Sequence, residues 1–327
     1  MFQIGIVAIG RNEGERLRRC LQSVISHPTI YVDSGSSDGS VEMARSLGDG
    51  VEVVELDRDI PFTAARARNA GFQRLQQLHP ETEFVFFVDS DCEVAIDWLH
   101  QAATALQTHP DVALVCGRRR ERHPNASIYN QLCDMEWDTP IGEATECGGD
   151  VMIAVKAFTQ VNGYNPSIIA GEEPELCVRL RQRNWRILRL DAEMTLHDAA
   201  MTRFSQWWKR SIRSGHAFAQ GSAMHGKSPQ RHWTRQTRSN WFWGLLIPLL
   251  ALTLAWPTHG LSLLLLLGYP VLAWRIHRHT KRRNYPAPKL YTFFCVLAKF
   301  PQVWGQFRYH WSQLRSTPTK LIEYKNH

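Results

Sequence analysis

Short apolar runs alternate with polar or amphipathic stretches over the first two thirds of the chain. The runs are rich in β-branched and aromatic residues, which predicts buried strands. They cover residues 4–9, 30–32, 51–55, 83–88 and 112–116. Helices are predicted between them at residues 13–25, 41–47 and 64–77, and the first places Leu17, Leu21 and Val24 on one face. This alternation predicts an α/β domain over residues 1–230.

The pattern changes at Trp241. Residues 241–256 and 261–274 contain no charged side chain, and the sequence from Pro257 to Gly260 between them is typical of a turn. Each segment is shorter than the roughly 20 residues that cross a bilayer comfortably. Two interpretations are open: a transmembrane helical hairpin over residues 240–276, with tryptophans as interfacial anchors, or a buried hairpin in a soluble core.

Basic clusters on both sides of these segments favour the membrane hairpin. They comprise Lys227, Arg231, Arg235 and Arg238 before it, and Arg275, Arg278, Lys281, Arg282 and Arg283 after it. The positive-inside rule then puts both flanks and the α/β domain in the cytoplasm, which predicts a multi-pass membrane protein. The formal charge is +7 with a pI near 9.1. Its concentration beside apolar segments indicates membrane lipids as partners and not nucleic acid.

A third apolar segment, residues 290–307, is interrupted by Lys299 and Pro301. If it crossed a membrane, the basic residues that follow it, including Lys320 and Lys325, would lie outside the cell, against the charge rule. We therefore expect residues 277–327 to form a basic, partly amphipathic tail on the membrane surface. The seven cysteines form no Cys-x-x-Cys pair, so neither a zinc site nor a disulfide framework is indicated.

Candidate chemistry begins with Asp89-Ser90-Asp91, at the end of a predicted strand. Residues two apart on a strand share a face, so this spacing predicts two neighbouring carboxylates. Such carboxylates repel unless a cation or hydrogen-bond donors lie between them. Oxygen ligands of this kind suit Mg²⁺ or Mn²⁺, which often bind together with a phosphate group. The plain alternative is that these acids cap a turn.

A second polar loop, residues 33–39, follows the predicted strand at residues 30–32. Its small residues allow a tight backbone, and its hydroxyl and amide groups can bind a ligand's polar edge. Ligands of open α/β sheets bind beyond the carboxyl ends of the strands, where Asp33 and the acid pair are expected. Taken alone, Asp33 is typical of a turn.

Several segments, in order, resemble the family 2 glycosyltransferases, which are membrane-associated inverting enzymes of the GT-A fold. The resemblance covers roughly residues 1–215. Residues 32–40 are similar to the family's motif Val-Asp-Asp-Gly-Ser-Ser-Asp-Gly-Thr, with Ser34 in place of the second acid. Residues 6–13 resemble its first strand, 67–71 its Ala-Arg-Asn segment, 89–91 its Asp-x-Asp motif and 171–176 its Glu-Asp motif. The resemblance implies a nucleotide-binding domain with a mixed central sheet.

The resemblance also implies roles for single residues. Glu173 stands where the family has its catalytic base, although a charge that complements the helix dipole explains this acid as well. The implied metal ligands are Asp91 and His197, with a purely structural histidine as the alternative. The residues implied to bind the nucleotide sugar are Glu13, Asp33, Arg68, Asp89, Arg210 and Arg213. For the last two arginines a solvated helix face is the alternative.

The implied activity is metal-dependent, inverting transfer of a sugar from a nucleoside-diphosphate sugar. The acceptor would be a hydroxyl or phosphate of a cell-envelope glycan or glycolipid, lipid-linked or polysaccharide. Two other interpretations stay open: a nucleotidyltransferase of similar α/β fold, and a non-catalytic membrane-anchored protein that binds sugar nucleotides. A charged and aromatic stretch suits either an acidic acceptor or plain surface; it comprises Arg118, Arg119, Arg120 and Arg122 with Glu136-Trp137-Asp138.

Overall fold

The apolar runs of the first 200 residues pair into one mixed sheet in the computed structural model, which describes residues 2–315. Its strands are β1 (Ile4–Gly10), β2 (Thr29–Asp33), β3 (Val51–Glu55), β4 (Phe84–Asp89), β5 (Cys92–Val94), β6 (Val112–Glu121), β7 (Gly142–Glu143), β8 (Val151–Ala154) and β9 (Arg186–His197). Their order is β3-β2-β1-β4-β8-β6-β9-β5, and β7 pairs with β9. The four neighbouring strands β3, β2, β1 and β4 run parallel to one another, and β8 is antiparallel to β4 and β6. The predicted α/β fold with a mixed sheet is confirmed.

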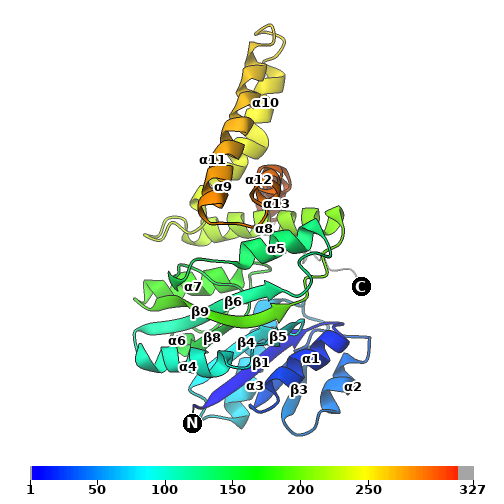
Figure 1. Ribbon diagram of the computed structural model, residues 1–327, viewed down its shortest axis with the longest axis vertical. Coiled ribbons are helices and arrows are strands. Elements are labelled where there is room, and N and C mark those ends of the chain that lie inside the picture. Colours follow the sequence, from blue (N-terminus) through cyan, green and yellow to red (C-terminus); the bar gives the residue numbers. More distant parts are fainter. Residues whose placement is uncertain (1, 316–327) are drawn as a thin grey trace. The chain divides into compact units, whose positions relative to one another are not determined.

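Helices cover both faces of this sheet (Figure 1). They are α1 (Glu15–Val24), α2 (Ser40–Arg45), α3 (Ala64–Leu78), α4 (Trp98–Thr108), α6 (Val155–Gln160) and α7 (Glu172–Gln182). Neighbouring residues of β4 face opposite layers, as strand geometry requires. The ring of Phe86 contacts Trp98 of α4, whereas the ring of Phe87 contacts Phe158 of α6. The acid pair therefore follows a strand that is buried on both faces.

Strand pairing sets the predicted site residues that follow strands β2, β4 and β9 at neighbouring strand ends. Asp33 at the end of β2 is paired with Gly10 of β1, and Asp89 at the end of β4 is paired with Ile9. The short antiparallel pair β5–β9 sets Cys92 opposite His197, so Asp91 lies beside that histidine. All of these residues belong to one compact unit of the chain, which comprises the residues up to Pro124 and Glu136–Ala200.

A second unit joins Asn125–Met135 to the described residues from 201 to 315, and it is helical. Its helices are α5 (Ile128–Trp137), which ends in the first unit, α8 (Phe204–His225), α9 (Thr234–Trp241), α10 (Ile247–Thr253), α11 (Gly268–Arg282), α12 (Pro288–Leu297) and α13 (Lys299–Leu314). Helices α8 and α13 cross closely through two glycines. A Cβ atom on Gly215 would lie 2.0 Å from the carbonyl oxygen of Gln302, and one on Gly305 would lie 2.0 Å from that of Ile212.

The prediction of a transmembrane hairpin over residues 240–276 is wrong. The two apolar segments do form helices that pair, and the Ser262 hydroxyl donates a hydrogen bond to the Ala251 carbonyl at 2.8 Å. They are broken, however, into a π-helical piece at Phe242–Leu246, the short α10 and a 3-10 piece at Leu261–Leu267. Within residues 2–315, no helix combines the length and apolar character needed to cross a bilayer.

The same finding contradicts the prediction of a multi-pass membrane protein with its α/β domain in the cytoplasm. The physical reason was visible in the segment lengths, since each apolar segment falls short of the roughly 20 residues required. Helix α11 then continues into basic residues from Arg275 to Arg282. In the predicted tail, α12 and α13 are described, whereas residues 316–327, with Lys320 and Lys325, lie outside the described residues. Contact of the tail with a membrane surface stays a prediction.

Candidate active site

The two acids of Asp89-Ser90-Asp91 have different surroundings. Strand β4 ends at Asp89 and β5 begins at Cys92, so a turn separates the two carboxylates. The Asp89 side chain is 30% exposed, whereas that of Asp91 is 3% exposed. Asp89 is therefore the acid that a large ligand can reach, and Asp91 lies deeper.

Arg68 of α3 connects Asp89 to the acids at the start of α7. Its buried guanidinium donates to Asp89 Oδ1 at 2.7 Å and to Glu172 Oε1 at 3.0 Å, and forms an ion pair with Glu173 Oε1 at 2.7 Å. Burial opposes the charge of Arg68, but the carboxylates of Glu173 and then Asp89 raise its pKa well above the ordinary range. This arginine is thus a permanent buried cation shared by three carboxylates.

Glu173 stands in the first turn of α7, after Gly171 in the left-handed conformation. Burial raises the pKa of Glu173 from 4.5 to about 7, and the negative charge of Glu172 adds to the effect, while Arg68 opposes it. A carboxylate that is half ionised near neutral pH suits a general base. Interaction with the helix dipole alone does not account for a glutamate held in this ionic network.

Asp150, to which the sequence assigned no individual role, organises the other side of Asp89. Its fully buried carboxylate accepts hydrogen bonds from the backbone N–H of Asp89 at 3.1 Å and the Thr195 hydroxyl at 2.6 Å. It also pairs with Arg119 Nη2 at 2.8 Å, and Arg119 lies 3.5 Å from Asp89 Oδ2. Burial opposes the charge of Arg119, but Asp150 raises its pKa. The signal for Asp150 was its position just before strand β8 and directly after Gly149, where a Cβ atom would lie 2.7 Å from Arg68 Nη2 and 2.8 Å from Asp89 Oδ2.

Asp91 and His197 form the candidate metal centre. Their Oδ2 and Nε2 atoms lie 3.2 Å apart, and ligand atoms of Asp91, Cys92 and His197 all lie within 4.8 Å of one another. Burial raises the pKa of the Cys92 thiol well above its ordinary range, so the thiol stays protonated and is a poor ligand for a hard cation. The carboxylate and the imidazole fit Mg²⁺ or Mn²⁺ completed by ligand oxygens.

The Asp33 loop is held by its own carboxylate. The buried Asp33 accepts from the backbone N–H groups of Gly35 at 2.8 Å and Ser36 at 2.7 Å, and from the Tyr31 hydroxyl at 2.9 Å. Asn12 ties this loop to the end of β1, because its side chain accepts from the Ser37 N–H at 2.8 Å. Asn12 was given no role from the sequence, although it lies within residues 6–13, which resemble the family's first strand. The contact of Asp33 with a nucleotide stays a prediction.

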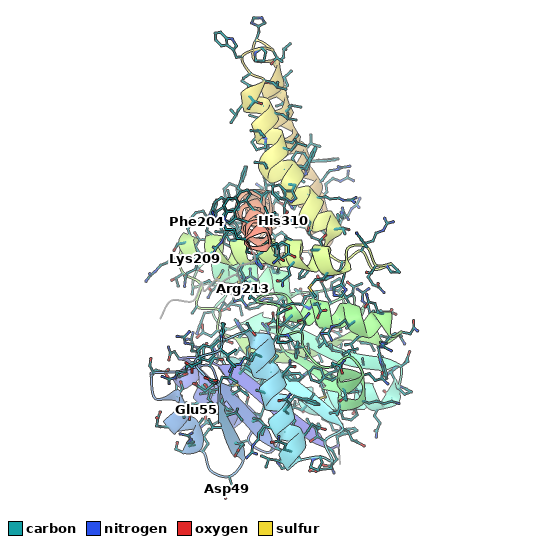
Figure 2. The ribbon with its side chains drawn as sticks, turned by 180° about the vertical axis from the view of Figure 1, so that it is seen from behind. Asp49, Glu55, Phe204, Lys209, Arg213 and His310 are labelled. Atoms are coloured by element: carbon teal, nitrogen blue, oxygen red, sulfur yellow. The ribbon has the colours of Figure 1, made fainter. Side chains whose placement is uncertain are left out.

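The remaining predicted residues are Glu13, in the first unit, and Arg210 and Arg213, in the second. Glu13 precedes α1 and pairs with Arg16 at 2.8 Å. Arg210 and Arg213 are half-buried on α8 in the second unit, where Figure 2 labels Arg213. Their binding to a nucleotide or diphosphate stays a prediction.

Comparison with known protein families gives two matches. Residues 6–149 match the family described as glycosyl transferase family 2. Residues 133–203 match the one described as the N-terminal domain of galactosyltransferase. Together these segments contain the strand ends, the Arg68 network and the candidate metal centre.

Similar proteins include two curated glycosyltransferases. The chain is 27% identical over 144 residues to glycosyltransferase AglE of Haloferax volcanii, covering 40% of this chain and 45% of AglE. It is 26% identical over 231 residues to the pre-mycofactocin glycosyltransferase of Mycobacterium tuberculosis, covering 67% of this chain and 46% of that protein. The chain thus spans about half the length of the curated relatives it matches.

Among solved structures, the chain resembles residues 1–349 of S. aureus TarS, crystallised in complex with UDP-GlcNAc. The TM-score is 0.52 at 13% sequence identity, covering 97% of this chain and 93% of the TarS chain. At 13% sequence identity, this structural similarity shows a shared fold and nothing about a shared substrate.

Proposed function

We propose that this chain, whose residues 6–149 match glycosyl transferase family 2, transfers a sugar from a nucleoside-diphosphate sugar to a hydroxyl or phosphate acceptor. The observation that carries this proposal is that Asp89 and the Asp91–His197 pair lie at strand ends, while Arg68 links Asp89 to Glu173 at the start of α7. These three acids have different environments. Asp89 is reachable by a donor, Asp91 lies beside His197, and Glu173 has a pKa near neutrality.

Glu173 is proposed as the base of a single in-line displacement. As the bond forms between the acceptor oxygen and the sugar's anomeric carbon, the bond from that carbon to the diphosphate oxygen breaks. The acceptor proton passes to Glu173, and the configuration at the carbon inverts. The pKa of about 7 supports this role, because a large fraction of Glu173 is ionised at neutral pH and this carboxylate is a stronger base than an ordinary glutamate. Arg68, 2.7 Å from Glu173 Oε1, orients the carboxylate.

Asp91 and His197 are proposed to hold a divalent cation, Mg²⁺ or Mn²⁺, which when bound neutralises charge on the departing nucleoside diphosphate. Asp89, reachable and flanked by Arg68 and Arg119, is proposed to face the donor. The backbone groups of the Asp33 loop, Glu13, and the two arginines of α8 are proposed to complete donor binding. The sequence order of these segments, shared with the family, supports this assignment.

UDP-GlcNAc is the first donor to test, because the TarS chain of similar fold was crystallised with it. For the acceptor we propose a cell-envelope glycan or glycolipid. Both curated relatives are named as glycosyltransferases, which supports the reaction class and leaves the acceptor to be found.

The test is a panel of radiolabelled nucleotide sugars incubated with the protein and a crude lipid and polysaccharide fraction, with and without Mn²⁺. We expect metal-dependent label in the acceptor fraction and release of nucleoside diphosphate. Asp91→Asn and Glu173→Gln should each abolish transfer. Matched controls are Asp111→Asn and Glu52→Gln, which alter exposed acids paired at the surface. Release of pyrophosphate would indicate a nucleotidyltransferase, and undiminished transfer by Asp91→Asn would refute the metal role.

A further inference from the structure

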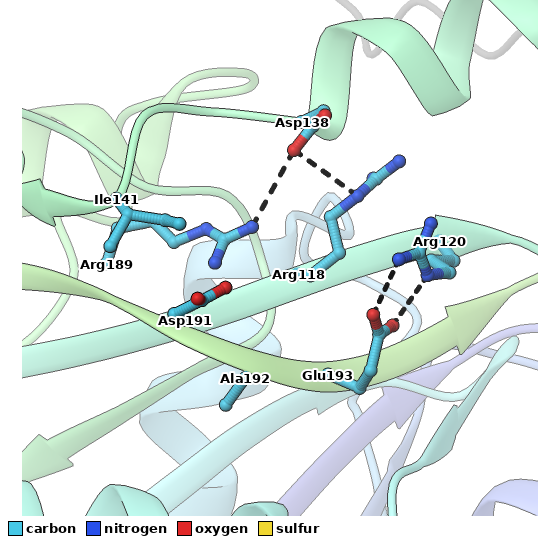
Figure 3. Close-up of a pocket in the computed structure, with 8 residues that line it drawn as sticks. All are labelled: Arg118, Arg120, Asp138, Ile141, Arg189, Asp191, Ala192 and Glu193. Carbon is cyan, nitrogen blue, oxygen red and sulfur yellow. Dashed lines mark hydrogen bonds and ion pairs between the residues drawn. The ribbon is translucent and has the colours of Figure 1, made fainter.

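A pocket beside strands β6 and β9 lies outside the proposed donor and base site (Figure 3). Its volume is about 250 Å³, and its lining comprises Arg118, Arg120, Asp138, Ile141, Arg189, Asp191, Ala192 and Glu193. Arg119, between two of these residues, contacts Asp89 and Asp150 instead. The pocket and the candidate active site therefore share strand β6 while using different side chains of it.

Two guanidiniums form the interior of this pocket. Arg118 is 6% exposed and Arg189 is 3% exposed. They share one carboxylate oxygen: Asp138 Oδ1 lies 3.5 Å from Arg118 Nε and 3.8 Å from Arg189 Nη2. Both distances exceed those of charge-assisted hydrogen bonds, about 2.7–2.9 Å. The Asp138 side chain is 57% exposed, so solvent weakens its compensation of two buried cations.

Arg189 has one unused hydrogen-bond donor. Its Nη1 donates to the Leu190 carbonyl, which fixes the guanidinium plane. Its Nε is buried and has no hydrogen-bond partner among the residues that the structure describes. A buried donor without a partner is costly, and an acceptor entering the pocket would remove that cost.

The negative charges of the lining are all at the rim. Asp191 is exposed and the Glu193 side chain is 55% exposed. Glu193 is moreover paired with Arg120 through two hydrogen bonds of 2.7 and 2.6 Å. Figure 3 shows this closed pair separate from the Arg118–Asp138–Arg189 group. The lining is neutral in sum, but its buried part is cationic.

We propose that this pocket binds the phosphate group of a phosphate ester, with Arg118 and Arg189 as its ligands. Planar guanidiniums match the oxygen spacing of phosphate, which accepts two donors at once. The volume admits a phosphate with part of its ester and is below the roughly 300 Å³ at which pockets for larger ligands begin. If the proposed function holds, the ester belongs to the acceptor; phosphate binding itself requires no sugar transfer.

Calorimetric titration without nucleotide sugar tests the pocket, using inorganic phosphate, glycerol 3-phosphate and glycerol as probes. We expect both phosphates to bind and glycerol not to bind. Arg189→Met should weaken binding at least tenfold, whereas Arg120→Met, at the rim of the same pocket, should change it less than threefold. Asp138→Asn should strengthen binding, because it removes the carboxylate that competes with the ligand.

Circular dichroism of each variant shows whether the fold persists, and Asp138→Asn keeps the proposal testable if the arginine variant unfolds. Binding of inorganic phosphate without glycerol 3-phosphate would overturn the ester assignment. Absence of phosphate binding, or binding that neither Arg189→Met nor Asp138→Asn alters, would overturn the site. Since no donor is present in this titration, its failure is distinct from failure of sugar transfer.

Discussion

Replacing Arg68 by methionine tests the buried ionic network directly. Arg68 is 1% exposed and contacts carboxylate oxygens of Asp89, Glu172 and Glu173 at 2.7, 3.0 and 2.7 Å. Methionine keeps much of the side-chain stem but removes the charge. Three carboxylates, two of them at the start of one helix, then lose their shared cation.

The expected cost follows from burial. Removing one partner of a buried ion pair typically destabilises a protein by about 3–5 kcal/mol. Total stabilities are about 5–15 kcal/mol, so the variant should lose a large share of its free energy of unfolding. The loss should depend on pH, because ionised Glu173 needs the cation and protonated Glu173 does not.

The direction of this dependence follows from the pKa of Glu173, which is raised from 4.5 to about 7 in the folded protein. Protonation of Glu173 therefore stabilises the fold fully below pH 4.5, and this contribution is lost as the pH rises through 7. The difference between the pKa of 4.5 and the pKa of about 7 in the folded protein corresponds to about 3 kcal/mol of stability. Without Arg68 the pKa should rise further, so Arg68→Met should be more destabilising at pH 8 than at pH 5.

Urea unfolding followed by circular dichroism at both pH values measures this effect. Arg74→Met is the matched control, since the Arg74–Glu52 pair is 40% exposed on both sides and should contribute at most about 1 kcal/mol. Adding Glu172→Gln and Glu173→Gln to Arg68→Met should restore stability. A cost for Arg68→Met no larger than that for Arg74→Met at both pH values would refute the reasoning.

Further predictions concern catalysis, metal binding and helix packing. Below the pKa of about 7, the sugar-transfer rate should fall about tenfold per pH unit, since only ionised Glu173 accepts a proton; a flat pH–rate profile between pH 5 and 8 would contradict this. His197→Gln should raise the Mn²⁺ concentration for half-maximal activity at least tenfold, while His109→Gln, at an exposed position, should not. Gly305→Ala should lower the free energy of unfolding by about 1–3 kcal/mol, and with it the thermal midpoint, because its Cβ would meet the Ile212 carbonyl at 2.0 Å; an unchanged midpoint would argue against the close contact.

Local pattern predicted most of the first unit. The runs that predicted strands at residues 4–9 and 83–88 correspond to β1 (Ile4–Gly10) and β4 (Phe84–Asp89). Such strands are recognisable because each is short, apolar and bounded by polar turns. The mixed order of the sheet was available only through the resemblance, since periodicity carries no information on which strands pair.

The site was predicted in part for the same reason. Asp91 and His197 were proposed as a pair by resemblance, and strand pairing across more than 100 residues explains their proximity. Asp150 was missed because its importance depends on three partners distant in sequence. The shared role of Arg68 was missed likewise, since a single arginine gives no sign that Glu172 and Glu173 will lie against it.

The transmembrane hairpin, in contrast, was predicted from the sequence and is contradicted by the structure. Apolar composition and flanking basic residues dominated the interpretation, although each segment was too short to span a bilayer. The structure divides these segments into short π, α and 3-10 pieces. Composition indicated apolar helices correctly, but helix length and continuity decide whether a helix spans a membrane.

The most direct test of the central claim is the rate of nucleoside diphosphate release from the accepted donor by Glu173→Gln at pH 8 with saturating Mn²⁺. Loss of a general base typically costs about 10²–10⁴-fold in rate, so the account predicts a fall of at least about a hundredfold relative to the unmodified protein, with donor binding retained. A rate within threefold of the unmodified protein would contradict the claim that Glu173 is the base of a sugar transfer at this site.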